Sequence, residues 1–258
     1  MSHAARSPDG LEIRFDTAGS GAPALVFVHG WSCDRTYWRE QMTAFADRHA
    51  VVAIDLGGHG ESGIGRSAWT MPAFGDDVAA VVVQLGLERV VLIGHSMGGD
   101  VVVEAALRLG DRVAGVVWVD TYQTLEDPST EEELEAFVEP FRSDFPGQTR
   151  RFIRSLFPPT ADPALAERVA DDMASAPPDI ALNALVHAWG NDGPVLDALE
   201  RLAVPVVAIN PDDRPTDIAS LGRHGIRTVI EHGVGHFPML EDPEQFDTLL
   251  DEVIDSFE

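Results

Sequence analysis

The chain has 258 residues, of which 45% are hydrophobic and 24% are charged. This length and composition suit one large α/β domain with a generous core, and they exclude a mostly disordered chain. The formal net charge is −25, from 43 acidic residues against 18 arginines and no lysine, and such a surface disfavours nucleic acid and anionic membranes as partners.

The first ten residues lack the apolar segment of a signal peptide, and no later run approaches the roughly 18 apolar residues of a membrane helix. We therefore expect a cytoplasmic protein whose partner is a small molecule. A homodimer is compatible with the sequence. The single cysteine, Cys33, cannot form an intrachain disulfide or a cysteine metal cluster, and we expect a packed thiol.

The first half of the chain predicts strands separated by helices. Residues 11–19 alternate apolar and polar side chains, which predicts an edge strand. Three continuous apolar runs, at residues 23–30, 49–58 and 89–96, predict strands that are buried on both faces. Residues 73–87 space their apolar side chains at three and four positions, which predicts an amphipathic helix.

The alternation continues with a helical pattern at residues 98–110 and another apolar strand at residues 113–121. Strands and helices that alternate with short connections predict a parallel sheet covered by helices on both faces. Active sites of such sheets lie at the carboxyl ends of the strands. The predicted strands end at Gly30, Asp55, Ser96 and Asp120.

The pattern changes between residues 123 and 195, where acidic, proline-punctuated helical stretches occur without a strand candidate. Strand patterns resume at residues 204–210 and 227–233, and a capped helix over residues 242–257 follows. We therefore predict an α/β core of residues 1–122 and 196–258. Residues 123–195 are predicted to form a helical cap, inserted after the sixth strand.

The segment "GHSMG", residues 94–98, has the form Gly-x-Ser-x-Gly between a predicted strand and a predicted helix. A turn this sharp strains the backbone of the serine, and Gly94 and Gly98 leave room for it. The pattern predicts that Ser96 is a nucleophile whose hydroxyl is open to substrate.

A serine hydroxyl is a weak nucleophile until a base accepts its proton. His236 follows a strand and a glycine-rich bend, so we predict it as the base, whereas His232 lies in the tail of the strand and is expected to be structural. The negative oxygen of a tetrahedral intermediate needs hydrogen-bond donors. The backbone amides of Trp31 and Met97 are the predicted oxyanion hole.

Four segments, "FVHGW", "DLGGHGES", "GHSMGG" and "GVGHFPMLEDP", in this order and spacing, resemble the α/β-hydrolase superfamily, specifically its esterase and haloperoxidase-like branch with a helical cap. The resemblance covers essentially the whole chain. It implies Ser/His/Asp acyl-transfer chemistry without a metal or an organic cofactor. The serine at the turn separates the chain from similar haloalkane dehalogenases and epoxide hydrolases, which use aspartate there.

The third member of such a triad has several candidates. Most of the superfamily places the acid after the seventh strand, but in the segment "AINPDDRPTD" this position aligns with Arg214. Asp212, Asp213 and Asp217 lie close to it in sequence. We favour Asp120 at the end of the sixth strand, because an apolar strand delivers it to the active edge, where a carboxylate could orient the imidazole. The competing interpretation is that Asp120 only forms a turn.

These features predict a serine carboxylesterase for small to medium-chain esters that acts through an acyl-enzyme. Lactone hydrolysis, carbon–carbon bond hydrolysis and perhydrolysis are alternatives on the same triad. A non-catalytic small-molecule receptor with this fold is an alternative from another class. Trp189 and Phe141, both in the predicted cap, are the expected substrate contacts.

Overall fold

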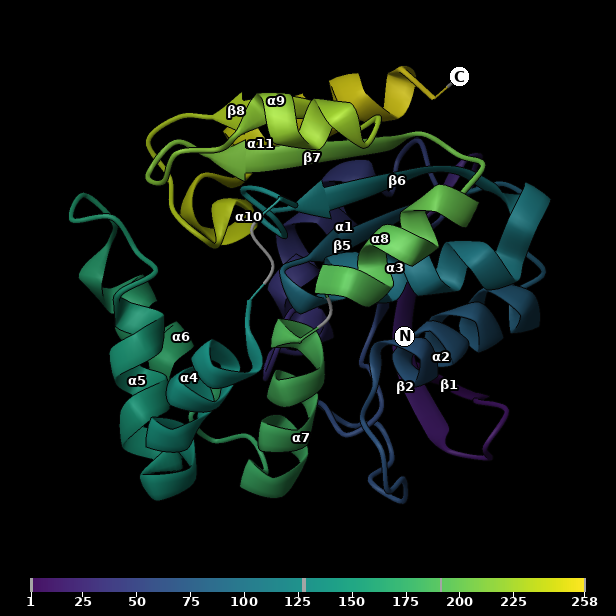
Figure 1. Ribbon diagram of the computed structural model, residues 1–258. Helices are drawn as coiled ribbons and strands as arrows, with labels where there is room; N and C mark the ends of the chain where they lie inside the picture. Colours follow the sequence, from purple (N-terminus) through teal and green to yellow (C-terminus); the bar gives the residue numbers. More distant parts are fainter. Residues whose placement is uncertain (1, 127–128, 191, 258) are drawn as a thin grey trace.

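The computed structural model describes residues 2–126, 129–190 and 192–257 (Figure 1). Eight strands form one sheet in the order β1-β2-β4-β3-β5-β6-β7-β8. The strands are β1 (Ser2–Arg6), β2 (Glu12–Ala18), β3 (Ala24–Val28), β4 (Val51–Ile54), β5 (Val90–His95), β6 (Val113–Val119), β7 (Val206–Pro211) and β8 (Arg227–Glu231). The predicted α/β class is confirmed.

The sheet is parallel from β4 through β8, and β2 runs antiparallel to both β1 and β4. One sequence-based expectation is wrong: the strand predicted at residues 11–19 does not form the edge, because β1 pairs along it. The β1 sequence, "SHAAR", contains no β-branched or aromatic residue, so strand propensity alone does not reveal it.

The helices are α1 (Arg39–Phe45), α2 (Met71–Gln84), α3 (Met97–Leu109), α4 (Glu131–Ser143), α5 (Phe145–Arg154), α6 (Pro163–Met173), α7 (Pro178–Trp189), α8 (Asp192–Arg201), α9 (Ile218–Arg223), α10 (Pro238–Glu241) and α11 (Pro243–Asp255), with short 3-10 turns η1 (Arg35–Trp38) and η2 (Gly110–Arg112). Helix α3 contacts both α2 and α8 on one face of the sheet, and α1 contacts α11 on the other (Figure 1). The sheet is therefore covered on both faces, as predicted.

Local sequence accounts for several helix starts. Asp242 caps α11 by accepting a hydrogen bond from the Gln245 amide at 3.1 Å, and Pro243 occupies the first helical position, both as predicted. Thr130 and Glu133 form a reciprocal capping box at α4.

The chain between β6 and β7 forms α4 to α8. Figure 1 shows α4 to α7 gathered at one end of the sheet, whereas α8 lies along the sheet beside α3. The predicted cap boundary between residues 195 and 196 falls inside α8. The division of the chain into a core and a cap domain stays a prediction.

The core is centred on the sheet, where every residue of β3, β4 and β5 is buried. Trp118 of β6 is fully buried, and its indole Nε1 donates to the Gly99 carbonyl of α3 at 3.0 Å. This bond joins two elements that flank the predicted nucleophile. None of the helices in the described ranges combines the length and hydropathy of a membrane span.

Candidate active site

Ser96 lies at the turn between β5 and α3, with φ 51° and ψ −122°. A Cβ atom at Gly94 would lie 2.1 Å from the Gly98 carbonyl oxygen, and one at Gly98 would lie 2.6 Å from the Val28 carbonyl oxygen. Both positions therefore require glycine for close backbone approach. The strained turn places Ser96 on the wall of a cavity, as the motif predicts.

His236 lies in the loop between β8 and α10. Hydrogen bonds to three other residues fix the backbone of this loop. The His236 amide donates to the Leu156 carbonyl at 3.1 Å, and His95 Nε2 donates to the His236 carbonyl at 2.7 Å. Burial lowers the pKa of His95 well below its usual value, so its ring stays neutral. The Glu241 carboxylate accepts from the amides of Gly235 and Phe237, both at 3.0 Å.

Asp120 follows β6 with φ 45°, and its side chain is 0% exposed. Its Oδ2 lies 2.6 Å from His236 Nδ1, and Gln123 Nε2 donates to its Oδ1 at 2.5 Å. A carboxylate can only accept, so Nδ1 carries a proton, and in the neutral ring Nε2 of His236 is the acceptor. Ser96, His236 and Asp120 all line the same cavity.

The other candidate carboxylates have different partners. Asp212 Oδ2 pairs with His232 Nδ1 at 2.8 Å on the exposed surface, and Asp217 caps α9. Asp213 Oδ1 lies 3.6 Å from Arg214 Nε. Within the described ranges, Asp120 is the carboxylate that hydrogen-bonds the His236 ring. Its catalytic role stays a prediction.

Trp31 and Met97, the predicted oxyanion-hole residues, both line the cavity. The Trp31 indole Nε1 donates to the Ala181 carbonyl of α7 at 2.7 Å. The loop is also held from below by His29, whose Nδ1 donates to the Gly30 carbonyl at 2.8 Å and whose Nε2 accepts from the Leu56 amide at 3.1 Å. Burial lowers the pKa of His29 to about 4, so this neutral tautomer persists at neutral pH.

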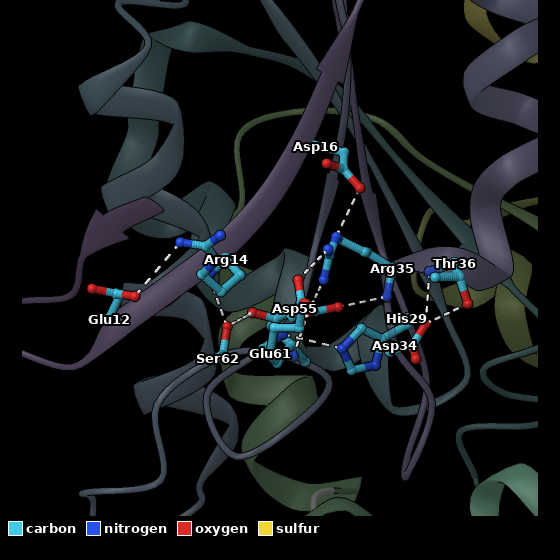
Figure 2. Close-up of polar contacts among 11 residues, drawn as sticks. Glu12, Arg14, Asp16, His29, Asp34, Arg35, Thr36, Asp55, Glu61 and Ser62 are labelled. Carbon is cyan, nitrogen blue, oxygen red and sulfur yellow. Dashed lines mark hydrogen bonds and ion pairs between the residues drawn. The ribbon is translucent and has the colours of Figure 1, made fainter. Parts of the chain in front are cut away.

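Figure 2 shows the ion-pair network that joins the loops after β3 and β4. Arg35 pairs with the buried carboxylate of Asp55, with Asp16 at 2.8 Å and with Glu61 at 2.5 Å. Ser62 donates to the Asp55 carbonyl at 2.7 Å. Asp55 therefore braces the two loops, and burial raises the pKa of its carboxyl group.

The cavity has a volume of about 320 Å³ and two chemically different walls. Its apolar side chains come mainly from α5, α6 and α7: Phe152, Ile153, Leu156, Met173, Leu185, Ala188 and Trp189. Besides His95, Ser96 and His236, its polar side chains come from the ends of α3, β6 and β7 and from nearby loops: Asp100, Asp120, Thr121, Tyr122, Gln123, Thr124, Ser129 and Arg214. The arrangement can hold a molecule with one apolar and one polar end.

Of the two predicted substrate contacts, one lines the cavity and the other does not. Trp189 lines the cavity, whereas Phe141 is 0% exposed and is not among the lining residues. The Phe141 ring lies behind Trp31 and Phe152, with ring centroids 5.7 Å from each. Phe141 therefore supports the cavity wall from behind.

Sequence reasoning missed four side chains that hydrogen-bond the predicted triad or its loop: His95, Gln123, Arg214 as a partner of Asp120, and Glu241. Glu241 follows His236 by five residues and is the last residue of α10, so no N-cap pattern singles it out in the sequence. Within the described residues, no cluster of His, Cys, Asp and Glu is arranged to hold a metal ion.

Residues 23–192 match the family model for the alpha/beta hydrolase fold. An esterase from Thermogutta terrifontis is 26% identical, with a TM-score of 0.84 over 100% of this chain and 99% of its own. Est816, described as an N-acyl homoserine lactone degrading enzyme, is 25% identical, with a TM-score of 0.82 over 97% of this chain and 99% of its own.

A non-heme haloperoxidase from Rhodococcus erythropolis is 40% identical over 113 residues, which are 43% of this chain and 41% of that protein. The chain thus aligns with less than half of that relative's length. The family match covers well over half of the chain and agrees with the strand order and the turn at Ser96. The chain belongs to the alpha/beta hydrolase fold family and is similar to esterases and haloperoxidases of that family.

Proposed function

We propose that this hydrolase is a serine carboxylesterase that cleaves small to medium-chain esters through an acyl-enzyme. The observation that carries the proposal is the 2.6 Å contact between Asp120 Oδ2 and His236 Nδ1 on a cavity that Ser96 also lines. The esterase of Thermogutta terrifontis, similar over the whole chain, supports the same activity.

In the proposed reaction, His236 Nε2 accepts the Ser96 hydroxyl proton as Oγ attacks the ester carbonyl carbon. Asp120 holds the ring in the required tautomer and stabilises its charged form. The backbone amides of Trp31 and Met97 donate to the oxyanion. The intermediate collapses by releasing the alcohol, which takes the proton from His236, and water then hydrolyses the acyl-Ser96 ester by the same steps.

We further propose that residues 123–195 act as a cap that shapes the acyl site. The apolar wall of the cavity comes from α5, α6 and α7, and a volume of about 320 Å³ suits short and medium acyl chains. Trp189, on this wall, is the proposed substrate contact.

The test is hydrolysis of p-nitrophenyl esters from acetate to dodecanoate. We expect Ser96→Ala to lose about 10⁴-fold or more in kcat/KM and Asp120→Asn to lose about 10³-fold to 10⁴-fold. The matched control is Asp213→Asn, a nearby carboxylate that is not hydrogen-bonded to His236, which should stay within a few-fold of the wild type.

Near-normal activity of Asp120→Asn would remove Asp120 from the triad. An inactive wild type across the whole series would remove simple esters as substrates. If Ser96→Ala still bound substrate-like ligands while the wild type turned none over, the receptor alternative would replace catalysis. Circular dichroism of each variant separates loss of function from loss of fold.

Lactone hydrolysis is the second candidate, and the likeness to Est816 over 97% of this chain favours it. The polar wall of the cavity could hold a lactone head group while the apolar wall holds an acyl tail. Assays with N-acyl homoserine lactones beside linear esters of equal acyl length decide between the two. A kcat/KM that is about 10-fold higher for the lactone would make lactones the better substrates.

A further inference from the structure

Arg214 occupies the loop between β7 and α9 and contacts two members of the proposed triad. Its Nη2 lies 2.5 Å from Asp120 Oδ2 and 3.5 Å from His236 Nδ1. His236 and Arg214 therefore share one oxygen of one carboxylate. The Arg214 side chain is 38% exposed and lines the cavity, whereas the Asp120 side chain is fully buried.

The loop that carries Arg214 is fixed to the loop that carries Asp120. Asn210 Nδ2 donates to the Tyr122 carbonyl at 2.8 Å, and the Asp217 amide donates to the Gln123 carbonyl at 2.8 Å. These bonds hold the two loops in one register, so the contact between guanidinium and carboxylate is built into the backbone.

The titratable and charged groups around the His236 ring come from four parts of the fold. They are Asp120 after β6, Asp213 and Arg214 after β7, His95 at the end of β5 and Glu241 in α10. His95 is neutral, and Glu241 is held by two backbone amides. Arg214 is thus the permanent positive charge nearest to the ring within the described residues.

A proton on Nε2 of His236 places a second positive charge beside Arg214, with Asp120 shared between them. The like charge disfavours the protonated ring, and the guanidinium also holds Oδ2 against Nδ1. We propose that Arg214 is a positioning residue of the catalytic centre: it anchors Asp120 against His236, and its charge makes the protonated ring less favourable than a neutral side chain at position 214 would. This inference rests on the proposed function.

The test is the pH profile of kcat/KM on an active p-nitrophenyl ester. A full charge at this distance moves an acid limb by about one to two pH units, and solvent exposure of the guanidinium reduces the expected effect to about one. We expect the acid limb of Arg214→Gln to lie about one unit higher than that of the wild type. Arg214→Lys, which keeps the charge, should lie within about 0.3 unit of the wild type.

The matched control is Arg223→Gln on α9, an exposed arginine paired with Glu126, whose profile should not move. An acid limb of Arg214→Gln that coincides with the wild-type limb overturns the inference. So does an equal shift for Arg214→Gln and Arg223→Gln, because such a shift reports only net charge.

A second readout needs no turnover and separates this inference from the esterase proposal. The ring resonances of His236 in the substrate-free protein, identified by their loss in His236→Gln, are followed by NMR as pH is varied. We expect the pH midpoint of their movement to rise by about one unit in Arg214→Gln. If no ester is hydrolysed, this midpoint still decides: a midpoint equal to that of the wild type overturns the role of Arg214.

Discussion

Two non-glycine residues of the proposed triad have a backbone conformation in the left-handed region, Ser96 with φ 51° and Asp120 with φ 45°. Such conformations cost about 1–3 kcal/mol each and persist only where surrounding contacts enforce them. Ser96 is held by the close approach of Gly94 to Gly98, and Asp120 by hydrogen bonds from His236 and Gln123. Both side chains are thereby aimed into one cavity before any substrate binds.

We expect Gly94→Ala to disrupt this geometry, because the new methyl group would lie 2.1 Å from the Gly98 carbonyl oxygen. The backbone must shift, at a cost of about 1–3 kcal/mol in the free energy of unfolding and about 100-fold in kcat/KM. Thermal unfolding and ester hydrolysis measure the two effects. Gly222→Ala in α9 is the control and should be neutral or slightly stabilising, because apart from its chain neighbours and the helix's own backbone no atom lies within 4 Å of the added methyl. Wild-type activity in Gly94→Ala would show that the turn tolerates a side chain.

At the scale of elements, β8 ends in an acidic residue that the proposed mechanism does not use. Glu231 is 0% exposed, and its Oε2 has no hydrogen-bond partner among the described residues. Burial raises the pKa of its carboxyl group from 4.5 to about 8, and the nearby acidic residues of α10 and α11 add to the rise. The end of β8 is therefore most stable with a neutral Glu231.

The pH dependence of stability follows from this shift. Between pH 4.5 and about 8, Glu231 binds more protons in the folded state than in the unfolded state. The contribution of neutral Glu231 to the free energy of unfolding is therefore fully present below pH 4.5 and is lost as pH rises through about 8. We expect Glu231→Gln to match the wild type near pH 5 and to exceed its free energy of unfolding by about 1 kcal/mol or more near pH 9. This corresponds to roughly 2–4 °C in Tm.

Scanning calorimetry at several pH values checks this difference. Glu252→Gln, an exposed position on α11, is the control and should leave the difference near zero at every pH. A wild type that is as stable as Glu231→Gln near pH 9 would contradict a buried, neutral carboxyl group.

The sequence predicts the elements whose pattern is local and strong. Buried strands appear in the sequence as apolar runs. The turn at Ser96 can be recognised because the glycines that it requires, Gly94 and Gly98, lie within two residues of the serine. The sequence does not predict β1, because its residues have low strand propensity. Pairing with β2 stabilises this strand instead. The partner of His236 depends on how the loops after β6 and β7 meet, so sequence position left Asp120 and three neighbours of Arg214 as alternatives. Sequence position also could not distinguish Trp189, which lines the cavity, from Phe141, which does not. Packing against neighbouring elements decides which side of each helix faces the cavity.

At the scale of the whole molecule, the net charge of −25 opposes the compact state. Arginines form ion pairs such as the one between Arg154 and Glu167, at 2.6 Å. Exposed pairs of this kind stabilise the folded state by only about 0–1 kcal/mol each. Acidic groups outnumber arginines by more than two to one, so repulsion among them is the larger electrostatic effect.

We therefore expect salt to stabilise the protein. Raising NaCl from about 0.05 M to about 1 M shortens the screening length severalfold, and Tm should rise by several degrees despite weaker ion pairs. Differential scanning fluorimetry measures Tm in NaCl and in sucrose. Sucrose is uncharged, so it shows how much of a rise in Tm comes from exclusion of the solute from the protein surface and how much comes from screening of charge. A Tm that falls with salt would mean that attractive pairs dominate.

The contacts of His95 link the loop after β3 to the loop that carries His236. A Cβ atom at Gly30 would lie 2.9 Å from His95 Nδ1, while His95 Nε2 holds the His236 carbonyl. A change from Gly30 to alanine would be accommodated only if residue 95 became smaller, and that second change would release the histidine loop. Natural substitutions at positions 30 and 95 are therefore coupled, so homologues should exchange these two residues together or keep both.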